Sequence, residues 1–141
     1  MVPSFEDGEL LLTEKVSYRF GEVQRGDVIV FEAPIGRKVD FIKRIVGLPG
    51  ERIEIRSGSV FINGVKIDEE YIDMASQGDI EKLLSDDEYF VLGDNRLASS
   101  DSRVFGAIKR SVIRGRVWFV YWPIIKSNVY AGVRVISGVN Y

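Results

Sequence analysis

The 141-residue chain is predicted to form an all-β fold of mainly antiparallel sheets, barrel-like in arrangement and with short helical turns. Short apolar runs of strand length recur along it, and Gly-, Pro- and Asn-containing turns separate them. The strongest turn signal is Asn63-Gly64 between two alternating runs, since both residues of a type I′ hairpin turn need positive φ. The length favours a single domain over residues 1–141.

The expected strands are apolar or alternating runs bounded by turn residues. In order, they are residues 10–12, 28–31, 40–46, 52–56, 59–62, 65–67, 89–92 and 116–122. Pro49-Gly50 ends the third strand, and Ser57-Gly58 joins the fourth to the fifth. Because residues 52–67 alternate and turn twice within a short distance, they are expected to form a β-meander with one buried face.

Two segments break this strand pattern. Residues 71–87 are expected to make a small surface excursion, in which 79–84 form one or two helical turns capped by Asp79. Residues 109–113 are expected to form a further helical turn that Gly115 closes.

The composition excludes several kinds of function. A net charge of −2 and a pI near 5.3 provide no basic field for nucleic acid. The chain has neither histidine nor cysteine, which removes disulfides, thiolate zinc sites and the usual neutral-pH base. We expect no metal site and no cofactor. No apolar run approaches the roughly 20 residues that span a bilayer.

Without His or Cys, the most conspicuous candidate for a catalytic base is Lys43, which lies in an apolar strand. Strand alternation places Lys43 on one face with Phe41 and Ile45. Burial disfavours an ammonium ion and lowers its pKa toward the working pH. The simpler interpretation is an edge-strand lysine whose amine reaches water.

A dense polar loop, residues 93–106, follows the strand at 89–92. Eight of its first eleven residues are polar or charged. Asx turns and solvated charges would explain such a loop in structural terms. It also carries the Ser, Asp and Arg side chains needed to orient an amine and to lock its partners in place.

Four segments in this order resemble the sequence boxes of bacterial type I signal peptidases. They are Met1-Val2-Pro3-Ser4-Phe5, Gly26-Asp27-Val28-Ile29-Val30-Phe31, the run from Phe41 to Gly50 that contains Lys43, and Gly93-Asp94-Asn95-Arg96 through Ser99, Asp101, Ser102, Arg103, Phe105 and Gly106. The resemblance covers nearly the whole chain. Because the excursion at 71–87 is short, the compact Gram-positive-like form is the better match.

The resemblance implies a signal-peptidase-like fold and a serine protease with a Ser/Lys dyad. Lys43 matches the general base, and Ser99 matches the residue that hydrogen-bonds this lysine. Asp101 and Arg103 match a salt-bridged support, and Asp94 belongs to the same supporting shell.

The implied substrates are preproteins, whose signal peptides are removed after small-x-small sites such as Ala-x-Ala. The family binds the substrate as an added β-strand. By position, residues from the first strands would line the substrate pockets: Met1, Phe5, Leu11, Val30, Asp40, Phe41 and Ile42. Shallow pockets would favour alanine, because larger side chains clash.

The family's nucleophilic serine immediately precedes the residue that Met1 matches. Ser4 lies where the family has threonine, four positions beyond the nucleophile, so it is not matched to the nucleophile. The 141 residues alone are therefore expected to be inactive. A serine before Met1 would complete the enzyme, whereas an alanine or a true start would favour a non-catalytic homologue that binds peptides or assists assembly.

The family is anchored in the cell membrane with its catalytic domain on the extracytoplasmic face. The aromatic run 118–122 could rest on the lipid interface or form an ordinary half-buried strand. Self-cleaving Ser/Lys repressors would need a DNA-binding segment, which the acidic balance does not support. The tail after Pro123 matches no family feature.

Overall fold

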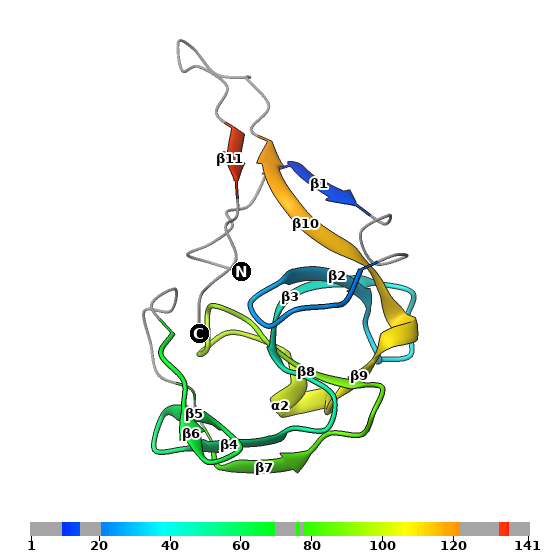
Figure 1. Ribbon diagram of the computed structural model, residues 1–141. Coiled ribbons are helices and arrows are strands. Elements are labelled where there is room, and N and C mark those ends of the chain that lie inside the picture. Colours follow the sequence, from blue (N-terminus) through cyan, green and yellow to red (C-terminus); the bar gives the residue numbers. More distant parts are fainter. Residues whose placement is uncertain (1–9, 15–20, 70–75, 77, 122–132, 136–141) are drawn as a thin grey trace.

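The computed structural model describes residues 10–14, 21–69, 76, 78–121 and 133–135, with backbone alone for 10–14, 118–121 and 133–135. Its larger sheet has seven antiparallel strands, in the order β1-β10-β2-β3-β8-β9 with β11 paired to β10 (Figure 1). Their bounds are β1 Leu10–Glu14, β2 Val28–Glu32, β3 Asp40–Gly47, β8 Glu88–Leu92, β9 Ile108–Lys109, β10 Ile113–Tyr121 and β11 Val133–Val135. The predominance of antiparallel strands confirms the predicted all-β class.

The smaller sheet, at the bottom of Figure 1, has the strand order β6-β5-β4-β7. Its strands are β4 Arg52–Arg56, β5 Ser59–Ile62, β6 Val65–Lys66 and β7 Ile80–Leu83. Asn63 and Gly64 have φ of 50° and 81°, as a type I′ turn requires. The predicted meander is confirmed.

The prediction for residues 79–84 was wrong, because Ile80–Leu83 form strand β7 and not helical turns. β7 pairs with β4 from Arg52↔Leu83 to Ile55↔Ile80, which satisfies its backbone along one edge. A segment this short gains too few internal hydrogen bonds to be a stable helix. The helical spacing of Ile80 and Leu83 was misleading, since Leu83 is 61% exposed.

Short helices occur at two places. The 3-10 helix η1, Arg110–Val112, confirms the predicted turn before β10. Gly115 does not close it, because Gly115 lies inside β10, opposite Val30 of β2. Helix α2, Ser102–Phe105, was not anticipated within the polar loop.

Two apolar clusters form the core, one on each face of β3. One contains Ile29, Phe31, Ile45 and Val91, with Phe41 packed against it. The other contains Val46 and Leu92 and extends to the β4 and β5 residues of the smaller sheet. Alternate residues of β3 thus enter different clusters, as strand geometry requires.

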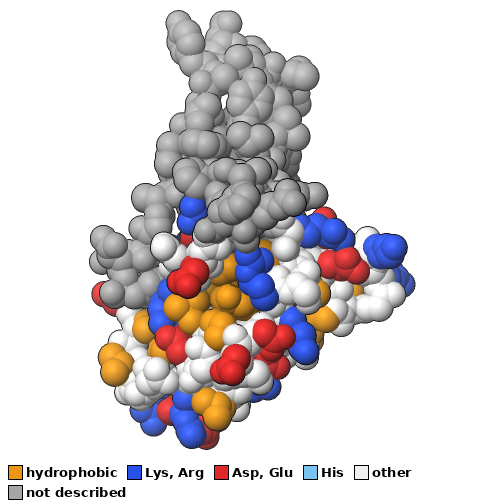
Figure 2. All heavy atoms as spheres, turned by 45° about the vertical axis from the view of Figure 1, so that its right-hand side comes forward, with side chains coloured by type: hydrophobic (Ala, Val, Ile, Leu, Met, Phe, Trp, Pro, Cys, Tyr) orange, Lys and Arg blue, Asp and Glu red, His pale blue; other side chains and the backbone are white. Residues whose placement is uncertain are grey.

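Figure 2 shows hydrophobic side chains gathered on one face of the described part, flanked by acidic and basic ones. Within the described residues, no helix is long and apolar enough to cross a membrane. The side chains of the aromatic run 118–122 lie outside the description, although the backbone to Tyr121 belongs to β10.

Candidate active site

Lys43 lies near the middle of β3, opposite Ile29 of β2. Its side chain is half-buried, and its Nζ lies 5.3 Å from the centroid of the Phe41 ring. Phe41 and Ile45 both pack on the cluster that contains Ile29. The predicted sharing of one face by Lys43, Phe41 and Ile45 is therefore confirmed.

Burial lowers the pKa of Lys43 below the ordinary lysine value of 10.5. The carboxylates of Asp101 and Asp94 act in the opposite direction, because they stabilise the ammonium form, but desolvation is the larger effect. A lysine in this state loses its proton more readily than a solvated one, which suits it to act as a base.

Ser99 brings a hydroxyl to the same place. Its Oγ is buried and makes no hydrogen bond of regular geometry to the described residues, although the hydroxyl is close enough to Asp101 to help lower the pKa of that carboxylate. A buried hydroxyl without a regular hydrogen bond is unfavourable, so such a group marks a point where a donor or acceptor is missing.

Gly93 lies between this hydroxyl and the lysine. A Cβ at residue 93 would fall 2.0 Å from Ser99 Oγ and 3.6 Å from Lys43 Cδ. The absence of a side chain at Gly93 therefore leaves room for Ser99, and the stem of Lys43 lies beside the same position. Steric room, not positive φ, is what requires glycine here.

Asp101 fixes the loop around Ser99. Its fully buried carboxylate accepts 2.8 Å hydrogen bonds from Arg103 Nε and Nη2, and a 3.0 Å bond from the Gly93 N–H. It also caps α2 by accepting from the Arg103 N–H.

Burial alone would raise the pKa of Asp101, but the bonds from Arg103 and Gly93 outweigh burial and hold this pKa below 3.8. The resulting stabilisation is present above the ordinary carboxylate range and is lost as pH falls through the lowered pKa. Asp101 therefore remains an anion wherever Lys43 could act.

Asp94 is held by Arg44, which sequence reasoning did not single out. The two form a bidentate pair with distances of 3.0 and 2.9 Å, and Arg44 Nη1 also donates to Gly26 O at 3.0 Å. Their side chains are 4% and 0% exposed. The pair ties the start of the polar loop to the back of β3.

Replacing Asp94 by alanine is expected to lower the free energy of unfolding by roughly 3–5 kcal/mol, because it leaves the buried Arg44 charge uncompensated. Urea denaturation measures this loss. The control is Glu81→Ala, which breaks the exposed pair with Arg52 and should cost about 1 kcal/mol or less. Equal losses in the two variants would contradict a structural role for the buried pair.

Two other loop residues were missed. Ser102 Oγ accepts the Val91 N–H at 2.9 Å, and Arg96 is buried with its Nε bonded to Gly93 O at 3.0 Å. Arg96 lies in the polar loop, but the amino-acid composition of the loop does not show which of its arginines is buried.

Of the predicted substrate-binding residues, the structure places only some next to one another. Val30 and Ile42 are half-buried and directly paired across β2 and β3, on the face opposite Lys43. Phe41 packs against Phe31 and Phe105 on the face of Lys43. The exposed Asp40 carboxylate accepts from Arg114 Nε at 2.7 Å.

The remaining predicted wall residues cannot be placed in a pocket. Leu11 lies on β1, where only the backbone is described, and Met1 and Phe5 lie outside the described residues.

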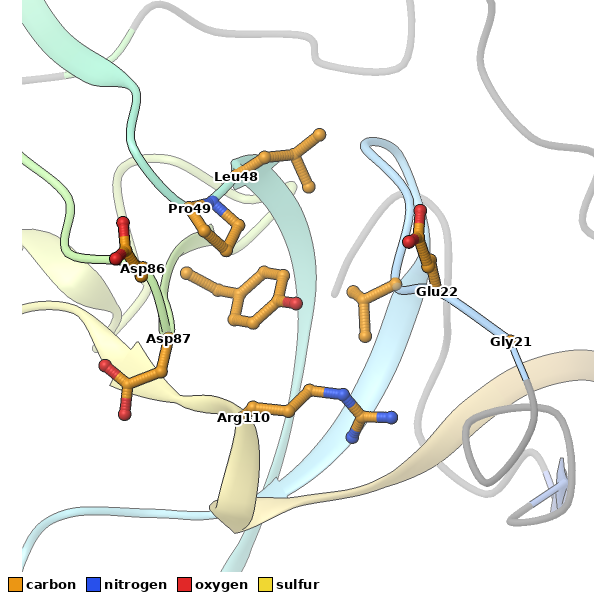
Figure 3. Close-up of a pocket in the computed structure, with 9 residues that line it drawn as sticks. Gly21, Glu22, Leu48, Pro49, Asp86, Asp87 and Arg110 are labelled. Carbon is orange, nitrogen blue, oxygen red and sulfur yellow. The ribbon is translucent and has the colours of Figure 1, made fainter.

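A separate pocket of about 460 Å³ lies between the segments 21–23, 48–49, 86–89 and Arg110. It is lined by Gly21, Glu22, Val23, Leu48, Pro49, Asp86, Asp87, Tyr89 and Arg110, none of which was predicted for the site. Figure 3 shows Asp86 and Asp87 on one side, Glu22 on the other and Arg110 between them. Burial raises the pKa of Tyr89, Arg110 lowers it and Glu22 raises it. Tyr89 therefore stays neutral at physiological pH and offers no base.

No group of three or more carboxylates placed to hold a metal occurs in the part of the chain that the structure describes. The site thus consists of a desolvated lysine, a buried serine hydroxyl and a carboxylate locked by arginine, on an antiparallel β scaffold. A desolvated amine in such a setting can act as a proton acceptor.

Comparisons with known proteins show the family of the chain. The family model described as "Signal peptidase, peptidase S26" matches residues 1–122. The chain belongs to this signal peptidase family, whose members remove signal peptides. The predicted family is confirmed.

Relatives cover most of the chain. Signal peptidase I of Bacillus caldolyticus is 41% identical, over 87% of this chain and 75% of that protein. Probable signal peptidase I-2 of Synechocystis is 37% identical over 88% of this chain, which spans 60% of that protein. The crystal structure of a signal peptidase I from Enterococcus faecalis matches with a TM-score of 0.61 and 34% identity, over 67% of this chain and 96% of that one.

Proposed function

We propose that the parent protein is a membrane-associated serine endopeptidase of the Ser/Lys type, in which Lys43 is the general base. The observation that carries this proposal is the half-buried Lys43, with its lowered pKa, and the buried Ser99 hydroxyl that lies with its stem beside Gly93. The nucleophile would be a serine directly before Met1.

In this mechanism the neutral Lys43 amine removes the proton from the serine hydroxyl as its oxygen attacks the scissile carbonyl. The ammonium then returns the proton to the leaving amine. Ser99 Oγ, which makes no regular hydrogen bond to the described residues, accepts a hydrogen bond from the Lys43 amine and directs its lone pair toward the nucleophile. Asp101 and Arg103 hold the loop in place.

The proposed substrates are preproteins cut after Ala-x-Ala-like sites. A substrate strand would be recognised by main-chain hydrogen bonds, and small pockets between strands would reject large side chains. Val30 and Ile42 supply paired, half-buried apolar surface of the kind such pockets need. Membrane anchoring and an extracytoplasmic catalytic domain belong to the same proposal.

The test compares residues 1–141 alone with versions that carry a serine or an alanine directly before Met1. Only the serine version is expected to cleave an Ala-x-Ala peptide, at the bond after the second alanine, as mass spectrometry would show. If the serine version binds the peptide without cleaving it, the non-catalytic peptide-binding homologue becomes the better account.

The pH dependence of cleavage should follow Lys43. Because burial lowers its pKa, kcat is expected to rise with pH through a value below 10.5 and then to level off. The measurement is a pH–rate profile at saturating peptide. A rise only near 10.5 would show that Lys43 is solvated or is not the base.

A further inference from the structure

Arg96 joins Glu69 and Ser76 to the polar loop. Its guanidinium donates to Glu69 Oε2 at 2.9 Å, to Glu69 Oε1 at 2.5 Å and to Ser76 Oγ at 2.7 Å. The same side chain donates from Nε to Gly93 O at 3.0 Å. The side chains of Arg96 and Glu69 are 0% and 6% exposed, so these bonds are shielded from water.

The peptide groups of Gly93 are therefore held on both sides. The carbonyl accepts from Arg96, and the N–H donates to Asp101. Gly93 also lies beside both Ser99 Oγ and the Lys43 stem. Any movement of Gly93 would change how closely Lys43 is covered.

We propose that Glu69 is a positioning residue for Lys43, acting through Arg96 and the Gly93 carbonyl. The proposal rests on the proposed function of Lys43 as general base. Glu69 lies 26 positions from Lys43 in the sequence, just before the segment 71–87 that was expected to be a surface excursion.

The physical reason is the buried charge of Arg96. With Glu69 present, a bidentate carboxylate compensates the guanidinium and fixes its plane. Without the Glu69 carboxylate, the plane of the guanidinium would no longer be fixed, and the buried charge would favour a shift of Arg96 toward water. The hydrogen bond to Gly93 O would then be lost or displaced.

The effect on Lys43 would be geometric. The carboxylates that act on its pKa are those of Asp101 and Asp94, and burial is the largest influence. The Asp94 carboxylate is itself paired with Arg44, and that of Asp101 with Arg103. Loosening Gly93 should admit water beside Lys43 and raise its pKa toward 10.5.

The test is Glu69→Gln, with Glu51→Gln as a matched control. Glu51 also binds an arginine bidentately, and that arginine, Arg25, also donates to a backbone carbonyl, that of Val46. The Lys43 pKa is measured by NMR titration on residues 1–141. The kcat and KM are measured on the version with serine before Met1.

In Glu69→Gln the Lys43 pKa is expected to rise and kcat to fall roughly tenfold to a hundredfold, with KM within about twofold. Glu51→Gln should lose stability and leave the Lys43 pKa and kcat unchanged. If Glu69→Gln does not fold, Ser76→Ala, which removes one bond to Arg96, should move the Lys43 pKa and kcat in the same direction by a smaller amount.

An unchanged Lys43 pKa and kcat in folded Glu69→Gln or Ser76→Ala would overturn the positioning role while leaving the base assignment intact. A Lys43 that titrates at 10.5 in the unaltered chain would instead refute the proposed function, and the positioning role with it.

Discussion

Lys43→Ala, in the version with serine before Met1, is expected to reduce cleavage of an Ala-x-Ala peptide by at least roughly a thousandfold. The reason is that the described part of the site offers no other group to take the serine proton. Asp101 is ionised but is occupied by Arg103 and Gly93. The measurement is kcat/KM, with circular dichroism to verify folding.

The control is Lys66→Ala, since Lys66 is exposed on β6 of the smaller sheet. That variant should cleave at the unaltered rate. Substantial activity in folded Lys43→Ala would refute the dyad assignment.

Gly93→Ala is expected to reduce activity by roughly a hundredfold or more, although alanine adds a single methyl group. The new Cβ would fall 2.0 Å from Ser99 Oγ and 2.5 Å from Ser99 Cβ, far inside contact distance. Ser99 would have to leave its position beside Lys43. The measurement pairs kcat with the free energy of unfolding.

Two variants separate the steric effect from general destabilisation. In Gly47→Ala the Cβ would fall 2.6 Å from Ile53 Cδ1, so this variant should lose about 1–3 kcal/mol of stability but keep the Lys43 pKa. Gly93→Ala combined with Ser99→Gly should recover stability but not activity. Normal activity in Gly93→Ala would contradict the close packing at Lys43.

The predictable features of the fold depend on local rules. Alternation located β4 and β5, and the two-residue turn Ser57-Gly58 between them fixes their pairing, because a two-residue turn leaves one register. The helix prediction for residues 79–84 failed because their pairing with β4 depends on residues far away in the sequence. β9 and α2 were missed because each is only two to four residues long, too short for a periodic pattern in the sequence.

Some residues of the site could likewise be predicted from the sequence, and others could not. Lys43 stood out because a cation in an apolar strand is unusual, and its face followed from alternation. Ser99, Asp101 and Arg103 came from the family resemblance, and the structure places Ser99 and Asp101 around Gly93. Glu69 and Ser76 could not be predicted, since only the folded chain brings them to Arg96.

The most direct test of the account is an NMR titration of the Lys43 side-chain amine in residues 1–141, which needs no nucleophile. We predict that Lys43 titrates clearly below the ordinary lysine pKa of 10.5. A Lys43 that titrates at 10.5 would contradict the central claim that burial makes it a base.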